Sequence, residues 1–512
     1  MACLRALIRA GLKPTLIDIG DRLPEAQQSA VGRMSALMPE QWDADDRALV
    51  TANPTLFDAD VPKKMVFGSE YYFGGDRPFS PIDTVPGMPS PSFARGGFSV
   101  AWGAALLPAS DEDLQDWPIR RSDLEPSYAR VLADMPLSAV DDELAAAFPL
   151  YKEAPHALPL ASEVGAFLAD LPAARGGKDA FVSGRARLAV DAALCRLCGY
   201  CLSGCVYGAI YATDSDLTRL ERAGRVQSLE GWAVTDLSED DGGVAVAMRH
   251  ASSGETQRKR FDRVFLAAGA IQSTRIVLAS LRLYDRTLIL KDSQKFIMPL
   301  LRLKRSPLSW PRSIALAAAF IDFKVPGLSE HWVHAQVSSV NDYVLRRLRI
   351  EPGARSLRAS VLAPLYERLL VAWCGLHSDH SSGIALTLTP TLRDGLPVLR
   401  VRPQRRPDGA RIVRRVANHL TRRLMPARTL GITPALVLGR PGSGNHHGGT
   451  LPMRERPRER LDTDTLGRIS EWRRVHVVDG AILPSIPATT LALVQMANAD
   501  RIASAVAAGA AA

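Results

Sequence analysis

The stretch "ACLRALIRAGLKPTLIDIG", residues 2–20, decides the fold class. Its first half has apolar residues at helical spacing and ends at Gly11, whereas its second half is a short apolar run that closes on Asp18 and a glycine. A helix, a tight turn and a buried strand ending in an acid form the second half of a dinucleotide-binding βαβ unit. In that unit the acid accepts a hydrogen bond from a ribose hydroxyl. The stretch therefore predicts an α/β fold with a Rossmann-like domain.

The first half of this unit is a strand followed by the glycine loop G-x-G-x-x-G, which belongs just before these residues. We expect the reading frame to continue upstream of Met1 and to encode that loop. The alternative is an inactive remnant, because a chain without the loop loses the helix N-terminus that neutralises a pyrophosphate.

Two later stretches extend the same domain. "RVFLAAGAIQSTRIVLAS" (263–280) is typical of a buried strand that runs through a glycine into a helix, and "VHVVDGAILPSIP" (475–487) of a short buried strand before a terminal helix. Between them, residues 290–405 alternate apolar and polar positions, as antiparallel strands do. We predict a discontinuous first domain at 1–285 and 435–512, with a cysteine-rich inset at 190–215, and an α+β substrate domain at 286–434.

Composition excludes several classes of protein. With 512 residues, 46% hydrophobic and 23% charged, the chain is neither disordered nor fibrous. It has no run of the roughly 18 apolar residues that a membrane helix needs, and no secretory signal is expected, so we predict a cytoplasmic protein. The net charge of +9 comes from arginine. In the helix expected at 409–424 the arginines form a solvated face without aromatic residues for base stacking, so no nucleic-acid partner is predicted.

Four motifs occur in a characteristic order: "GGFSVAWG" (96–103), "FLAAGAIQSTRIVLAS" (265–280), "HHGGTLPM" (446–453) and "VHVVDGAILPSIP" (475–487) before a terminal helix. Through them the chain resembles the glucose–methanol–choline (GMC) family of flavin-dependent alcohol oxidoreductases over nearly its whole length. The resemblance implies FAD as cofactor and CH–OH groups as the site of oxidation. It also implies a Rossmann-like FAD-binding domain beside a substrate domain with an antiparallel sheet.

The resemblance further implies which residues contact FAD. The adenosine would lie against the Asp18 carboxylate at the ribose, the Val234 backbone at the adenine, and the segment of Ala268 and Gly269 on the ribose side. The isoalloxazine and pyrophosphate would lie beside Gly96, Gly97, Ser99, Asp479 and Gly480. For each glycine, the alternative is an ordinary turn.

Oxidation of an alcohol needs a base near the flavin, because the carbon releases a hydride only as the hydroxyl loses its proton. Neutral histidine accepts a proton near pH 7. The family pattern His-x-x-Gly-Thr-x-x-Met places His446 as catalytic base, with His447 as the rival one residue away. The family's second polar residue, Asn or His, falls on Thr490, which forms hydrogen bonds but cannot act as a second base. Histidines that only cap a loop are the alternative.

The motif "CRLCGYCLSGC" (195–205) has the C-x2-C-x2-C-x3-C spacing of ferredoxins. Zinc fits less well, since structural zinc sites usually draw on two separated pairs of ligands. We predict Cys195, Cys198 and Cys201 as ligands of an iron–sulfur cluster, with Cys205 as a fourth if the loop folds back. The alternative is buried thiols that pack a loop over the flavin. Some members of the resembled family carry a cluster that passes electrons from the flavin onward.

The sequence thus predicts a GMC-type FAD-dependent dehydrogenase or oxidase of a small-molecule alcohol or sugar. A cluster would imply an electron-acceptor protein, and its absence would leave oxygen or a quinone as acceptor. The alternatives are an inactive or FAD-deficient remnant and an iron–sulfur-linked electron-transfer flavoprotein component. We expect His377, His380, Cys374 and Asp379 to be residues of a strand turn rather than a metal site.

Overall fold

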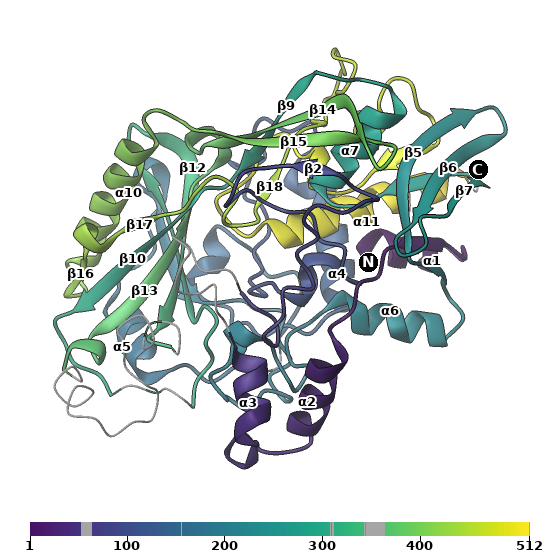
Figure 1. The fold of residues 1–512 in the computed structure, drawn as a ribbon. Helices are drawn as coiled ribbons and strands as arrows, with labels where there is room; N and C mark the ends of the chain where they lie inside the picture. Colours follow the sequence, from purple (N-terminus) through teal and green to yellow (C-terminus); the bar gives the residue numbers. More distant parts are fainter. Residues whose placement is uncertain are drawn as a thin grey trace.

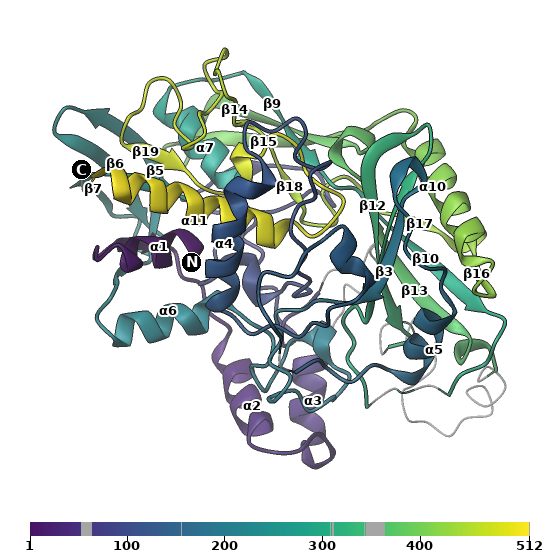
Figure 2. The ribbon, with the colours of Figure 1, turned by 180° about the vertical axis from the view of Figure 1, so that it is seen from behind.

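The computed structural model describes residues 1–52, 64–154, 156–307, 309, 312–341, 344 and 364–510. A large sheet covered by helix α10 (Gly409–Leu424) forms one side of the molecule, and smaller sheets with several helices form the other (Figure 1). The two ends of the chain meet on that second side, where α1 (Ala2–Arg9) packs along α11 (Leu491–Ala510) (Figure 2).

Two pairs of parallel strands lie near these ends. Strand β1 (Thr15–Asp18) pairs with β4 (Gln227–Glu230), and β8 (Val264–Leu266) pairs with β19 (Val475–Val477). The predicted strand ending in Asp18 is confirmed, and β8 runs into α7 (Ala270–Ser280) as predicted. Among the described residues, β1 and β8 each have one strand neighbour. In a complete Rossmann-like sheet, the strand of the glycine loop adjoins the strand that ends in the acid.

The large sheet has seven antiparallel strands in the order β16-β10-β13-β12-β11-β3, with β17 also paired to β10. The alternating pattern predicts β10 and β12 but not β11 or β13, because the latter two are nearly continuous apolar runs and are largely buried on both faces. The bounds are β3 (Phe181–Arg185), β10 (Lys295–Arg302), β11 (Ala319–Val325), β12 (Ser329–Ser339), β13 (Leu369–Gly375), β16 (Thr429–Gly431) and β17 (Val437–Leu438).

Two smaller sheets complete the strand structure, and the predicted α/β fold class with an antiparallel second half is confirmed. A five-stranded sheet has the order β18-β9-β14-β15-β2, and a three-stranded antiparallel sheet the order β5-β6-β7. Their bounds are β2 (Ile82–Asp83), β5 (Trp232–Asp240), β6 (Gly243–His250), β7 (Thr256–Phe261), β9 (Thr287–Asp292), β14 (Gly383–Arg393), β15 (Leu396–Gln404) and β18 (His447–Gly448).

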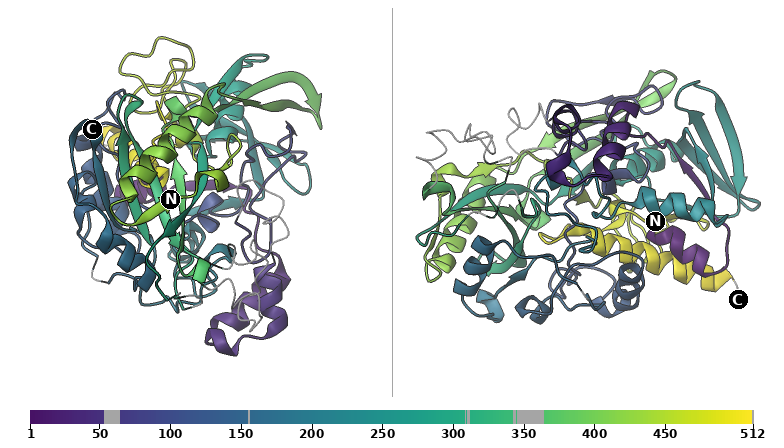
Figure 3. Two further views of the ribbon diagram at one scale, coloured as in Figure 1. Left: turned by 90° about the vertical axis from the view of Figure 1, so that its left-hand side faces the viewer. Right: turned by 90° about the horizontal axis from the view of Figure 1, so that it is seen from below.

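The helix predicted at 409–424 forms over those residues as α10. Its apolar face is buried in the core of the large sheet and most of its arginines are exposed, as the pattern predicts. A helix pair, α2 and α3, stands out from the body of the molecule (Figures 1 and 3). The remaining helices are α2 (Glu25–Ser35), α3 (Ala44–Thr51), α4 (Arg121–Ala133), α5 (Ser162–Asp170) and α6 (Thr213–Arg222).

The predicted domain limits stay a proposal, because strands cross them. Strand β3 from the predicted first part pairs with β11, and β2 pairs with β15. Both sheets therefore combine residues from either side of the limit at 285. None of the described helices is both long and apolar enough to span a membrane.

Candidate active site

The double glycine forms a left-handed turn, with φ of 86° at Gly96 and 58° at Gly97. A Cβ at Gly96 would lie 2.9 Å from Thr213 Oγ1, whereas nothing lies within 4 Å of the Cβ position of Gly97. Gly96 thus lets the turn pack against the start of α6. Gly97 faces open space, where a ligand could approach its backbone.

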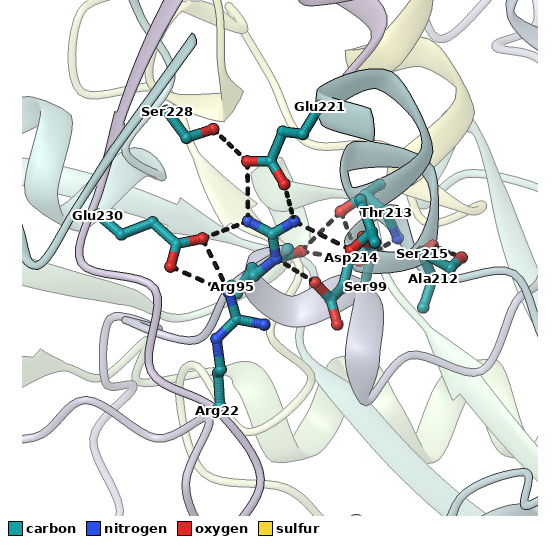
Figure 4. A network of polar contacts seen from close by, with 12 residues as sticks. Arg22, Arg95, Ser99, Ala212, Thr213, Asp214, Ser215, Glu221, Ser228 and Glu230 are labelled. Carbon is teal, nitrogen blue, oxygen red and sulfur yellow. Dashed lines mark hydrogen bonds and ion pairs between the residues drawn. The ribbon is translucent and has the colours of Figure 1, made fainter. Parts of the chain in front are cut away.

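Ser99 fastens this turn to α6 (Figure 4). Its hydroxyl donates to the Gly96 carbonyl at 2.7 Å and accepts from the backbone N–H of Thr213 at 3.0 Å. The Thr213 hydroxyl donates to the same carbonyl at 3.1 Å. The predicted contact of Ser99 with the flavin stays a prediction, because its hydroxyl is engaged within the turn.

Arg95 precedes the double glycine and connects the turn to α6 and β4 (Figure 4). Its side chain is 3% exposed, and its guanidinium binds Glu221 at 2.7 Å and also Asp214, both on α6. It also pairs with Glu230 at the end of β4. Sequence reasoning missed Arg95, although a charged residue beside two glycines is a signal that could have singled it out. The arginine fixes the glycine turn against the carboxyl end of β4.

Asp18 closes β1 directly beside Glu230 of β4. Burial raises the pKa of Asp18 to about 6, although hydrogen bonds from the backbone N–H groups of Ile19 and Gly20 act in the opposite direction. The carboxyl is therefore ionised in most molecules at pH 7. In that form it can accept the hydrogen bond from a ribose hydroxyl that the sequence predicts.

Small exposed residues connect β8 to α7. Ala267, Ala268 and Gly269 are exposed, although Leu266 before them and most of α7 after them are buried. Gly269 has φ of 82°, and nothing lies within 4 Å of its Cβ position. The chain thus offers an open, small-residue surface at the N-terminus of α7, where the first backbone N–H groups lack helical partners.

Asp479 and Gly480 join this surface to the histidine loop. The Asp479 carboxylate accepts hydrogen bonds from the Ser273 hydroxyl on α7 and from the backbone N–H of Gly269, and burial raises its pKa. The Gly480 carbonyl accepts from the backbone N–H of Gly449 at 2.9 Å. Asp479 therefore holds the ends of β8, β19 and α7 together.

The loop that carries the predicted base is held by β9 and the residue after it. Ser293 N–H donates to the His446 carbonyl at 2.9 Å, and Gly442 N–H donates to the Asp292 carboxylate at 2.7 Å. Asn445 has φ of 53°, so the backbone turns left-handed just before His446. These contacts place His446 directly before β18.

His446 and His447 each have a ring nitrogen, Nδ1, that is buried and has no partner among the described residues. Burial lowers the pKa of His446 well below its ordinary value, and the charges of Lys295 and His334 act in the same direction. Burial lowers the pKa of His447 to about 4. Both rings are therefore neutral at pH 7, the form that accepts a proton. His446 keeps more exposed surface than His447.

Thr490 is engaged by the backbone of Leu107. Its hydroxyl accepts from Leu107 N–H at 2.6 Å and donates to the Leu107 carbonyl at 3.2 Å, and the residue is 3% exposed. The donor of the hydroxyl is thus already used. A catalytic role for Thr490 stays a prediction, and its contacts indicate a structural one.

The four clustered cysteines, Cys195, Cys198, Cys201 and Cys205, are free thiols that line one largely apolar cavity. Cys201 Sγ accepts a hydrogen bond from a backbone N–H at 3.4 Å. Burial raises the pKa of Cys198 to about 11 and that of Cys201 to about 12, so both thiols are protonated without a metal. No three of the sulfurs lie within 4.8 Å of one another. They therefore stand further apart than four thiolates around one zinc ion, at Zn–S distances of about 2.3 Å.

The cysteine loop lies between the α2–α3 pair and the glycine segment. Trp42, between α2 and α3, stacks on Tyr207 with ring centroids 6.0 Å apart. On the other side, Lys64 donates to the Trp102 carbonyl at 3.1 Å, and the thiols of Cys201 and Cys205 are close enough to act on its pKa. Trp102 belongs to the "GGFSVAWG" motif, so the two motifs are neighbours in space.

A histidine cluster lies at the turn after β13. The rings of His331 and His377 stack at 3.6 Å and 14°, and Asp379 approaches them at 3.7 Å and 3.6 Å. Stacked rings direct their nitrogen lone pairs in parallel, so they do not converge on one ion as metal ligands do. Cys374 is buried in the core of the large sheet. One ligand atom each of His331, His377 and Asp379 lies within 4.8 Å of the others, so the expectation of polar turn residues rather than a metal site stays a prediction.

The residues predicted to contact FAD fit that cofactor chemically. Gly97 and Gly269 have open space at their Cβ positions, and Asp18 is an ionised acid at a strand end. Val234, the predicted adenine contact, lies half-buried on β5 at a bulge. Open glycine turns near a helix N-terminus suit a pyrophosphate, and the acid suits a ribose.

Comparison with known proteins bears on the fold. No protein-family model matches the chain, and no curated protein sequence matches it. Among solved structures, it is similar to pyridoxine 4-oxidase from Mesorbium loti, with a TM-score of 0.58 and 14% sequence identity over 98% of this chain and 96% of that chain. At this identity the likeness concerns the backbone arrangement. The chain therefore shares with pyridoxine 4-oxidase a mixed α/β fold with antiparallel sheets.

Proposed function

We propose that the protein is an FAD-dependent oxidoreductase of the glucose–methanol–choline family that acts on CH–OH groups of an alcohol or sugar. The observation that carries the proposal is His446, a neutral and partly exposed imidazole whose buried Nδ1 has no partner among the described residues. Its loop is bonded through Gly449 to Gly480, beside the segment predicted to hold the cofactor. The fold shared with a protein named as an oxidase of pyridoxine supports the same class of reaction.

Asp18, Gly97, Val234 and the 268–269 and 479–480 segments would hold FAD. When bound, FAD accepts the hydride that leaves the substrate carbon. The protein residue that accepts the proton is His446: the O–H bond breaks and the proton passes to its neutral imidazole. In the same reaction the C–H bond breaks, its electron pair leaves with the hydride, and a carbonyl forms. His447, whose ring is also neutral, is the rival base.

The test is flavin reduction without oxygen. The protein is expressed with any in-frame residues upstream of Met1, incubated with FAD and separated from unbound FAD. It should keep the absorbance of bound flavin, and an alcohol or sugar should bleach that absorbance. The matched control is His446→Gln, which should bind FAD equally and bleach far more slowly. Failure to bind FAD, or bound FAD that no member of a broad alcohol and sugar panel reduces, would contradict the proposal and favour the remnant.

We also propose that the cysteine loop binds an iron–sulfur cluster. The supporting observation is that all four thiols face one cavity, with sulfurs spaced too widely for zinc. A cluster would pass single electrons to an acceptor protein. Without a cluster, oxygen or a quinone would be the electron acceptor. Iron and acid-labile sulfide should be present in anaerobically purified protein and fall in Cys198→Ser, but not in Cys374→Ser, whose thiol lies outside the cavity. Equal iron in both variants would exclude the cluster.

A further inference from the structure

A polar row crosses the large sheet. Lys295 of β10, Gly375 of β13, His334 of β12 and Asp322 of β11 lie directly opposite one another in register across four neighbouring strands. Residues opposite each other share one face of a sheet. Phe323, the next residue after Asp322, stacks on a histidine of α10 at 5.9 Å. Because successive side chains point to opposite faces, the row lies on the face turned away from α10, toward the interior of the molecule.

Two buried members of the row have unused hydrogen-bonding atoms. His334 Nδ1 lies 2.8 Å from Asp322 Oδ1, and the two side chains are 1% and 0% exposed. His334 Nε2 and Asp322 Oδ2 have no partner within the part of the chain that the structure describes. Because the carboxylate holds a proton on Nδ1, Nε2 is the ring nitrogen of His334 that stays free for a ligand. Phe320 contacts the ring edge-on at 4.9 Å and fixes its orientation.

Lys295 adds a positive charge to the row. Its ammonium donates to the Ser293 hydroxyl at 3.2 Å, and the carboxyl group of Asp292 is close enough to raise its pKa, although no ion pair forms within the described ranges. Burial lowers its pKa to about 8, so it is charged in most molecules at pH 7. A Cβ at Gly375 would lie 2.5 Å from this ammonium. The ammonium therefore extends over Gly375, which separates Lys295 from His334 in the row.

Lys295 of this row contacts the loop that carries His446, the predicted base. A Cβ at Gly444, in the loop before His446, would lie 2.5 Å from Lys295 Cγ, so this loop packs on the lysine stem. The charges of both Lys295 and His334 act on His446. Lys295 and His446 each keep part of their surface exposed.

We propose that Lys295 and His334 recognise the substrate, which is an alcohol that also carries an anionic group, a carboxylate or a phosphate. Lys295 binds the anionic group. His334 Nε2, oriented by Asp322, forms a hydrogen bond with a second hydroxyl of the substrate, so that the proton of the reacting hydroxyl stays free to pass to His446. The hydroxyl chemistry rests on the proposed function, whereas anion recognition depends on Lys295 alone.

Ligand binding tests the anion site without flavin chemistry. Glycolate and glycerol 3-phosphate, with ethylene glycol and glycerol as neutral counterparts, are added at constant ionic strength while the melting temperature is measured. At least one of the two anions should raise the melting temperature, and the neutral alcohols should not. The anion that raises it shows whether the site prefers a carboxylate or a phosphate. Lys295→Met should lose the shift, Lys295→Arg should keep part of it, and Lys304→Met, at an exposed lysine paired with Asp170, should keep all of it. The proposal would be overturned if neutral and anionic ligands raised the melting temperature equally, or if Lys295→Met showed the same anion-dependent rise as the unmodified protein.

The kinetics of flavin reduction distinguish the role of Lys295 from that of His334. With an anionic alcohol, Lys295→Met should raise KM about tenfold or more and change kcat little, because a charge-assisted contact is lost. His334→Gln should lower kcat by about tenfold or more but keep the anion-dependent rise in melting temperature. Anion binding without reduction by any alcohol would contradict the proposed function alone. Reduction by neutral and anionic alcohols at equal KM would contradict the substrate class alone.

Discussion

At the scale of single residues, the proposed reaction depends on His446. Replacing it with Gln should slow anaerobic flavin reduction by about 10²–10⁴-fold, the usual contribution of a positioned base. His447→Gln is the matched control, since the neighbouring ring is equally neutral but more buried, and should reduce the rate much less. Stopped-flow bleaching of the flavin measures both. If His447→Gln has the larger effect, the base is His447.

The pH dependence of that step follows from the burial of His446. Burial lowers the pKa of the imidazole most, and the positive charge of Lys295 acts in the same direction. A lowered pKa keeps the ring in its proton-accepting form as the pH falls, so the rate should stay constant below the ordinary histidine pKa of about 6.5 and fall only at more acidic pH. The rate of flavin reduction between pH 8 and 5 measures this, at pH values where the fold is intact. A loss of rate centred at the ordinary value would contradict the buried environment.

Thr490 is expected to matter for stability rather than for rate. Thr490→Val removes both hydrogen bonds to Leu107 and leaves a buried N–H and carbonyl unpaired, which should lower the free energy of unfolding by about 1–3 kcal/mol. Thr490→Ser keeps the hydroxyl and serves as the control. Urea unfolding measures stability, and flavin reduction measures the rate. A slowed reaction without loss of stability in Thr490→Val would restore its predicted catalytic role.

At the scale of elements, Arg95 joins the glycine turn, α6 and β4. Arg95→Met would leave Glu221, Asp214 and Glu230 without their shared cation, and we expect a loss of about 2 kcal/mol, since the three carboxylates are partly exposed. Arg22→Met is the control, because Arg22 pairs with Glu230 from an exposed position, and it should cost less than about 1 kcal/mol.

Salt distinguishes this electrostatic role from simple packing. The carboxylates repel one another once Arg95 is absent, so 1 M salt should reduce the destabilisation seen in urea unfolding. A loss that is equal at low and high salt would mean that the arginine acts through its stem alone.

At the scale of the whole molecule, a single carboxylate near the end of the chain connects two helices from its first third. Asp500 on α11 is 0% exposed and pairs with Arg9 of α1 and, at 2.7 Å, with Arg130 of α4. Asp500→Asn should lower the free energy of unfolding by about 2–3 kcal/mol and speed trypsin cleavage within α1. Asp134→Asn, at a more exposed partner of Arg9, should have a much smaller effect. Equal stability in the two variants would show that α1 is held by its apolar contacts.

Much of the element structure could be predicted because its signals are local. The helix and strand at residues 2–20, the strand and helix at 263–280 and the helix at 409–424 all follow from periodicity and glycine positions. Strands β11 and β13 could not be predicted, because burial on both faces removes the alternation that marks a strand.

The fold class, the order of the glycine motifs and the histidine pair at 446–447 can be read from local sequence, because each depends on residues within one short segment. The contacts of Thr490, Arg95 and the row of Lys295, His334 and Asp322 emerge only when the chain is folded. Their partners lie far away along the chain: Thr490 contacts Leu107, and Lys295 is aligned with His334 by strand register. A hydrogen bond or a cross-strand row depends on which segments are packed together, and no local pattern encodes that choice.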